Sequence, residues 1–120
     1  AEAVSLINTL MGTSINIERR CFNLSIGKGG LSGPAVKPVA VKLVCDVFNA
    51  VNIPIIGLGG IMNVHDAIEF FMAGASAIQV GTANFIDPTI SERLISDIDA
   101  WLNAHGISDI KEIIGAVHKS

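Results

Sequence analysis

The chain has 120 residues, of which 50% are hydrophobic and 16% are charged, and its net charge at pH 7 is −3. This length and composition suit one globular domain with a real core and exclude a disordered chain. The acidic balance, with Arg19-Arg20 as the one basic pair, argues against nucleic-acid binding. The apolar stretches are too short to cross a bilayer, so we expect a cytoplasmic protein with no membrane partner.

The first half of the chain reads as one strand, a long connection and one helix. A near-continuous apolar run over residues 3–8 predicts a strand that is buried on both faces, as in a parallel sheet covered by helices. Residues 9–35 form a connection that contains an edge-strand pattern at residues 15–18 and ends in the glycine-rich segment 27–34. A loop of this length is usually functional. Apolar spacing predicts a helix over residues 37–51.

The second half alternates strands with helices. We expect, in order, a strand over residues 54–57, a helix over 64–72, a strand over 77–80, a helix from Asp87-Pro88 to about residue 104, and a short helix over 108–114. Asn63 is suited to cap the first of these helices, with Asp66 in capping-box register, and Gly74 is suited to end it. This alternation predicts the α/β class, with a parallel sheet and right-handed crossovers.

The start of the chain points to a longer protein. Residues that read as a strand follow Ala1 almost at once, without a starting methionine. A complete (β/α)₈ barrel needs roughly 200 residues or more. We therefore interpret residues 1–120 as the C-terminal half of a single barrel domain. Cys21 and Cys45 lack metal-ligand spacing, and we expect both to be reduced thiols.

Two strand ends run into glycine, at Gly59-Gly60 and at Gly81-Thr82. Glycine lets main-chain N–H groups approach an anion closely, and the last two strand-to-helix loops of an α/β barrel often form a phosphate site. The Thr82 hydroxyl would add a further donor. One such glycine alone is better explained by a tight turn. Two in succession, the second followed by threonine and a one-turn helix pattern, favour phosphate binding.

Two polar segments are candidates to contact the rest of the ligand. Asn8-Thr9 lies at the carboxyl end of the first strand, where an amide can read a ring imide or a carboxylate, although a turn hydrogen bond would explain it equally well. Ser32-Gly33-Pro34 can contact a flat ligand through its backbone, cover it as a lid, or be a flexible surface loop.

Few residues suggest reaction chemistry. No acid–base pair, nucleophile or metal cluster stands out, and Lys28 and Lys37 read as solvated lysines that could touch an anion. These observations leave a flavin mononucleotide, a sugar phosphate and a nucleotide as compatible ligands.

Four stretches of the chain resemble the dihydroorotate dehydrogenase family. They are residues 5–12, 29–38, 53–61 and 74–85, and they match in order and in spacing over essentially the whole chain. Within the family the resemblance is to the catalytic subunit of type 1B, the bacterial NAD-linked form. Type 1A enzymes usually carry Asn-Ser where this chain has Asn8-Thr9.

The resemblance implies an enzyme, with FMN as its cofactor, that oxidises dihydroorotate to orotate in the synthesis of the pyrimidine nucleotide UMP. This chain would supply the last three strands of the barrel and their helices. The residues implied to contact FMN are Ile7, Gly33, Gly59, Gly60, Gly81 and Thr82, of which the last four hold its phosphate. Asn8 and Thr9 would bind the substrate ring.

The resemblance places no catalytic residue in this chain. In the family a cysteine base removes the C5 proton of dihydroorotate while hydride passes from C6 to flavin N5. That cysteine and a flavin-contacting lysine lie in the first part of the barrel, and neither Cys21 nor Cys45 matches the base. We therefore expect this chain to be inactive alone.

The family's partner is an electron-transfer subunit with FAD and an iron–sulfur cluster, so we expect homo- and hetero-oligomers. One alternative is a non-catalytic half-barrel that binds flavin or phosphate and lacks the base. A sugar-phosphate isomerase is a further alternative, but nothing in that class requires Asn8-Thr9 together with residues 31–34.

Overall fold

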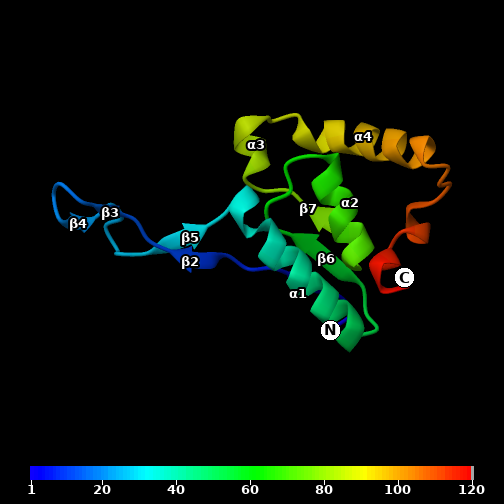
Figure 1. Cartoon of the computed structure of the whole chain (residues 1–120), viewed down its shortest axis with the longest axis horizontal. Helices are drawn as coiled ribbons and strands as arrows, with labels where there is room; N and C mark the ends of the chain where they lie inside the picture. Colours follow the sequence, from blue (N-terminus) through cyan, green and yellow to red (C-terminus); the bar gives the residue numbers. More distant parts are fainter. Residues whose placement is uncertain (120) are drawn as a thin grey trace.

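Three parallel strands form the sheet that organises the chain. The computed structural model describes residues 1–119, and its strands β1 (Val4–Leu6), β6 (Ile55–Leu58) and β7 (Ala77–Gln79) lie in the order β1-β6-β7 (Figure 1). Leu6 pairs with Gly57, and Leu58 pairs with Gln79. Because all three strands run in the same direction, the loops that leave their carboxyl ends emerge at one edge of the sheet. The predicted α/β class is confirmed.

The helices pack on this sheet and on one another. α1 (Lys37–Ala50) lies against β6 and α2 (Val64–Ala73), and α2 also packs on β7 and on α4 (Ile90–Ala104). The largest fully buried side chains are Val44, Ile55 and Phe70. They come from α1, β6 and α2 respectively, so the core lies between the sheet and the first two helices.

The predicted signals at the ends of α2 are confirmed, but the capping box forms only in half. The Asn63 side chain accepts a hydrogen bond from the Asp66 main-chain N–H at 3.0 Å, and Gly74 ends the helix with φ +130°. Asp66 does not complete a capping box with Asn63. The Asp66 carboxylate instead accepts two other hydrogen bonds. One oxygen accepts the main-chain N–H of Met62, the residue before Asn63, and the other accepts the Lys37 ammonium.

The C-terminal part of the chain differs from the prediction over residues 108–114. A single short 3₁₀ helix, η2 (Ile110–Glu112), replaces the longer helix expected there, and a second one, η3 (Ala116–Lys119), follows beyond the predicted range. Gly115 separates them with φ +72°, and a side chain at this position would lie 2.4 Å from the Phe48 ring. Gly115 lies just after the predicted range, and its positive φ beside Phe48 accounts for the separation of η2 from η3.

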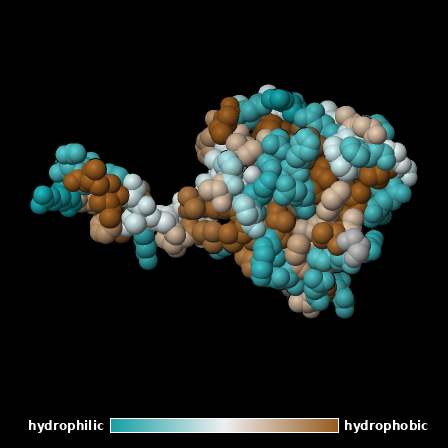
Figure 2. Space-filling model, viewed as in Figure 1, coloured by the Kyte–Doolittle hydropathy of each residue, from teal (hydrophilic) through white to brown (hydrophobic). Residues whose placement is uncertain are grey.

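The long connection forms an arm, residues 10–31, that extends from the body (Figure 1). β2 (Leu10–Gly12) pairs antiparallel with β5 (Gly29–Leu31), and β3 (Ile15–Asn16) pairs antiparallel with β4 (Cys21–Phe22). The sequence predicts only one short edge strand here. Figure 2 shows apolar side chains along the arm, and its large exposed ones are Met11, Ile15, Ile17, Phe22, Leu24, Ile26 and Leu31.

The first strand is shorter and more open than predicted. β1 covers Val4–Leu6 rather than residues 3–8, and Ser5 at its centre is exposed. Its one neighbour among the described residues is β6, so β1 is an edge strand there, and the exposed Ser5 shows that one of its faces is open. A further short helix, α3 (Ala83–Ile86), follows β7 before α4 begins. Within residues 1–119, no helix combines the length and apolar character needed to cross a membrane.

Both cysteines are free, as predicted, but their surroundings differ. Cys21 is exposed on the arm, and Cys45 is half-buried in α1. Burial, followed by the charge of Asp46, raises the pKa of the Cys45 thiol above its ordinary value. We expect iodoacetamide at mildly alkaline pH to alkylate Cys45 on the order of tenfold more slowly than Cys21, because less of it is accessible thiolate. Mass spectrometry of a time course, with Cys21→Ser to isolate the slow phase, checks this; equal rates would contradict it.

Candidate functional site

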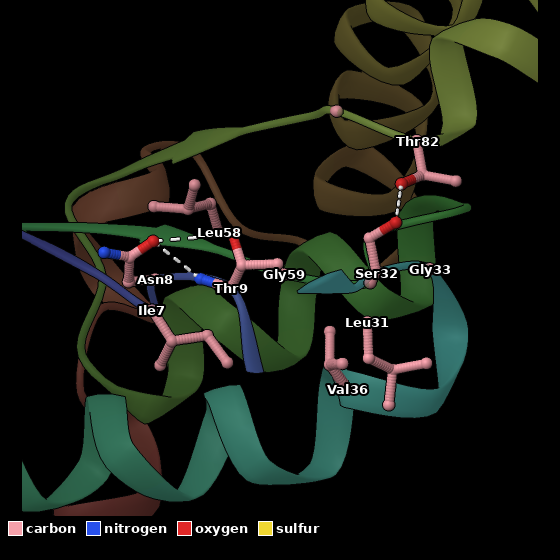
Figure 3. A pocket seen from close by; sticks show the side chains of 12 residues that line it. Ile7, Asn8, Thr9, Leu31, Ser32, Gly33, Val36, Leu58, Gly59 and Thr82 are labelled. Atoms are coloured by element: carbon pink, nitrogen blue, oxygen red, sulfur yellow. Dashed lines mark hydrogen bonds between the residues drawn. The ribbon is translucent and has the colours of Figure 1, made fainter. Parts of the chain in front are cut away.

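A cavity of about 140 Å³ opens at the carboxyl edge of the sheet (Figure 3). The eight residues that the family resemblance implies as contacts of FMN or substrate all line it: Ile7, Asn8, Thr9, Gly33, Gly59, Gly60, Gly81 and Thr82. Of the other candidates, Ser32 lines it, whereas Lys28, Pro34 and Lys37 do not. Four further residues complete the lining: Leu31, Ser32, Val36 and Leu58. The structure therefore brings together residues that are up to 75 positions apart in the sequence, from Ile7 to Thr82. It does so because three parallel strands and the end of the arm meet at this edge.

The turn after β6 requires glycine for reasons internal to the fold. Gly59 has φ +127° and Gly60 has φ +80°, a backbone region that other residues rarely adopt. A Cβ atom on Gly60 would lie 2.7 Å from the carbonyl oxygen of Gly33 and 2.9 Å from the main-chain nitrogen of Lys37. Gly60 thus packs directly on the segment that leads from the arm into α1, and the two walls of the cavity touch at this point.

Gly81 differs from Gly60 because the fold does not require a glycine there. It is absent from the residues with positive φ, and a Cβ atom built on it would meet nothing within 4 Å. The backbone of Gly81 is nevertheless part of the cavity lining. A tight-turn explanation therefore does not account for this glycine. Open space directly in front of a main chain is what close approach by an anion needs.

The polar side chains of the lining make hydrogen bonds within the lining. The Thr82 hydroxyl donates to the Ser32 hydroxyl at 2.8 Å and so links the turn after β7 to the end of the arm (Figure 3). The Asn8 side-chain oxygen accepts the N–H of Thr9 at 2.7 Å. This is a turn hydrogen bond of the kind that would explain Asn8-Thr9 without a ligand. It orients the Asn8 amide at the end of β1, beside the cis peptide bond between Leu6 and Ile7.

The lining carries no titratable side chain. Its apolar members, Ile7, Leu31, Val36 and Leu58, face a set of glycines and uncharged polar residues, a composition suited to holding a flat ring and an anionic group. Cys21 and Cys45 both lie outside it. Among residues 1–119, no group of three or more His, Cys, Asp or Glu residues could hold a metal ion. The cavity can thus bind and orient a ligand, but its own lining offers no acid or base.

A charged network lies directly behind the glycine turn. The Lys37 ammonium donates to the Asp66 carboxylate at 2.7 Å and to that of Glu69 at 3.0 Å, and Asp66 also accepts the N–H of Met62 at 2.9 Å. Neither Lys37 nor Asp66 lines the cavity. The interpretation of Lys37 as a solvated lysine is therefore wrong, because two carboxylates hold it in place.

The Lys37 network predicts a loss of stability at alkaline pH. The hydrogen bonds that Lys37 donates to Asp66 and then to Glu69 raise the pKa of Lys37 above its ordinary value of 10.5. A group whose pKa is raised by folding contributes stability that is complete below its ordinary pKa and is lost as pH rises through the raised value. We expect wild-type protein to lose more unfolding free energy than Lys37→Met between about pH 9 and about pH 12. Denaturant titrations check this, and parallel pH profiles would contradict it.

Two lining residues, Val36 and Leu58, were not singled out from the sequence. Leu58 is flanked by Gly57 and Gly59, so its side chain falls at the end of β6 where the strand meets the cavity. Position at the carboxyl end of a buried strand is a signal that would have indicated Leu58. Val36 is the residue before α1 and reaches the cavity because the segment from Gly33 turns toward Gly60. No local pattern marks it.

Comparison with protein families gives a match over most of the chain. The family model described as dihydroorotate dehydrogenase matches residues 1–102. A curated relative from Bacteroides fragilis, named dihydroorotate dehydrogenase B (NAD(+)), catalytic subunit, is 58% identical over 117 residues. A relative of the same name from Geobacter metallireducens is 56% identical over 117 residues. Both alignments cover 98% of this chain, but 39% and 38% of the relatives respectively.

Solved structures show the same likeness. The crystal structure of an Eimeria tenella DHODH in complex with ferulenol superposes with a TM-score of 0.80 at 30% identity, and the alignment covers 99% of this chain and 32% of that one. The ligand-free form of an Eimeria tenella DHODH gives a TM-score of 0.72 at 35% identity over 77% of this chain. The fold of this chain is therefore that of a piece of a TIM-barrel enzyme.

Proposed function

Since this chain belongs to the dihydroorotate dehydrogenase family, we propose that it is the C-terminal part of an FMN-binding (β/α)₈ barrel that oxidises dihydroorotate to orotate in pyrimidine synthesis. The proposed domain covers residues 1–120. One observation carries the proposal: the eight residues expected to contact FMN or substrate line one cavity at the carboxyl edge of a parallel sheet. Active sites of barrel enzymes form at this edge.

The glycine turns are proposed to hold the phosphate of FMN. Main-chain N–H groups of Gly59, Gly60 and Gly81 would donate to it, together with the Thr82 hydroxyl. The open space in front of Gly81 supports this assignment, because a ligand atom can come close to the main chain there. Ile7 and Gly33 would contact the flavin ring. When bound, FMN supplies the two-electron acceptor that the oxidation of dihydroorotate requires.

Asn8 and Thr9 are proposed to bind the dihydroorotate ring. Asn8 offers both an amide donor and an acceptor, and it lies at the carboxyl end of β1 next to Ile7. Because the lining contains no titratable side chain, the proton of the substrate must go to a group outside it. We therefore propose that the cysteine base lies elsewhere in the full-length protein and that this chain is inactive alone.

The names of the relatives support the NAD-linked type. Both curated relatives carry NAD(+) in their names and are called the catalytic subunit, which implies that another subunit works with them. For this chain we propose an electron-transfer partner that carries FAD and an iron–sulfur cluster. Homo- and hetero-oligomers and a cytoplasmic location are proposed with it.

A second candidate function is a non-catalytic half-barrel that binds flavin or phosphate. The absence of a titratable side chain from the cavity lining is the observation that favours it. Under this alternative the chain would bind FMN weakly and would not oxidise dihydroorotate in any form of the protein.

The two candidates are separated by purifying the full-length protein encoded by the gene and, in parallel, residues 1–120. We expect the full-length protein to carry bound flavin, seen by its absorbance, and to form orotate from dihydroorotate. We expect residues 1–120 to form none. A full-length protein that binds FMN without turnover would support the second candidate, and one that binds neither added FMN nor phosphate would overturn both.

A further inference from the structure

We propose that the ion pair between Lys37 and Asp66 is a positioning clamp. It sets the distance between two walls of the cavity, which are the turn at Gly59-Gly60 and the segment from Gly33 to Lys37. The affinity for the phosphate end of FMN would then depend on two side chains that do not touch the ligand. This inference rests on the proposed function, since it concerns the same cavity.

Asp66 gathers three segments at one buried carboxylate. It is the one buried charged residue in the described part of the chain, with 7% of its surface exposed. One of its oxygens accepts the Lys37 ammonium from the start of α1, and the other accepts the N–H of Met62 from the turn after β6. Its own N–H donates to Asn63. Asp66 therefore fixes the glycine turn to α1 and to α2 at once.

The same segments touch again on the cavity side. Gly60 packs against the carbonyl oxygen of Gly33 and the main-chain nitrogen of Lys37, at distances that leave no room for a Cβ atom. Gly60 is two residues before Met62, and Gly33 is four residues before Lys37. The clamp thus joins, on the side away from the cavity, the same two backbone segments that meet at Gly60 on the cavity side. Loss of the clamp would let these walls separate.

A second ion pair in α1 shows why the location of the first matters. Lys42 and Asp46 pair four residues apart within the helix, with 71% and 50% of their side chains exposed. The corresponding values for Lys37 and Asp66 are 23% and 11%. An exposed pair within one helix contributes little and joins no separate segments. Breaking a buried pair leaves an uncompensated charge and is more disruptive. Lys42 and Asp46 are therefore matched controls.

A rival explanation gives Lys37 a direct electrostatic role. If its charge attracted the phosphate through space, Asp66 and Glu69 would weaken that attraction, because they neutralise it. Asp66→Asn would then strengthen FMN binding. Under the clamp, Asp66→Asn weakens FMN binding, as Lys37→Met does. The two explanations predict opposite signs for one substitution.

The test is a titration of the full-length protein with FMN and with riboflavin, which lacks the phosphate, followed by flavin fluorescence. We expect Lys37→Met and Asp66→Asn each to weaken FMN binding by about 10- to 100-fold, by analogy with the loss of metal affinity when residues that orient metal ligands are replaced. The Lys37→Met/Asp66→Asn double variant should be no weaker than the single ones, since each breaks the same pair. Riboflavin affinity should fall less than FMN affinity, because riboflavin lacks the phosphate that the Gly60 turn would hold, and Lys42→Met and Asp46→Asn should bind FMN as wild type does.

The outcomes separate the clamp from the function on which it rests. A wild-type protein that binds no FMN overturns the proposed function. A wild type that binds FMN, with variants that bind it equally well, overturns only the clamp, and tighter binding by Asp66→Asn establishes the rival. Equal losses for FMN and riboflavin would also count against the clamp. Lys37→Arg keeps the pair and should bind FMN nearly as wild type does, which guards against a Lys37→Met protein that fails to fold.

Discussion

Replacing Gly60 with alanine is expected to lower the free energy of unfolding by about 1–3 kcal/mol and to weaken FMN binding by about 100-fold or more. The residue has φ +80°, which costs any residue with a Cβ atom. The new atom would also lie 2.7 Å from the Gly33 carbonyl oxygen and 2.9 Å from the Lys37 nitrogen. Both are backbone atoms, so relief requires the segment between the arm and α1 to move, and that segment is a wall of the cavity.

Gly106 provides the control for this substitution. It has φ +67° at the end of α4, and a Cβ atom on it would meet nothing within 4 Å. Gly106→Ala therefore carries the backbone cost, roughly 1 kcal/mol, without the collision, and FMN binding should be unchanged. Denaturant unfolding and flavin fluorescence measure the two quantities. If Gly60→Ala is no less stable than Gly106→Ala and binds FMN like wild type, the wall contact at Gly60 does not shape the cavity.

The parts of the fold that local sequence signals specify could be predicted. Asn63 and Gly74 mark the ends of α2 because an N-cap side chain and a positive φ act within one turn of helix. The two glycine strand ends could be placed together because consecutive parallel strands in a right-handed α/β arrangement end at the same edge. That reasoning needs only the order of elements along the chain, and Gly60 and Gly81 do line the same cavity.

The parts that depend on distant partners could not be predicted. β5 contains Gly29 and Gly30, which are poor strand formers, and it exists because it pairs with β2. A Cβ atom on Gly30 would lie 2.3 Å from the Thr9 side chain, so the glycine serves this contact rather than a flexible loop. Asp66 shows the same limit, since its register pointed to a cap and its partner Lys37 is 29 residues away.

Gly81→Ala is expected to separate ligand binding from stability. Because its φ is not positive and its Cβ would meet no other atom, the substitution should leave the melting temperature unchanged. The methyl group would instead occupy the space in front of the main chain that the proposed phosphate needs. We expect FMN affinity to fall by about 10- to 100-fold, which corresponds to roughly 1.4–2.7 kcal/mol. Riboflavin affinity should not change, since that ligand has no phosphate to displace.

The comparison of Gly81→Ala with Gly60→Ala tests what each glycine is for. Both residues follow a strand and line the same cavity, but only Gly60 is held by contacts with its own chain. Thermal unfolding of the apoproteins gives the stability of each variant, and fluorescence titrations with FMN give the affinity of each. A stable Gly81→Ala protein with wild-type FMN affinity would show that the phosphate does not lie against this turn. Weaker FMN binding at unchanged stability would mean that Gly81 is a glycine because the ligand requires it.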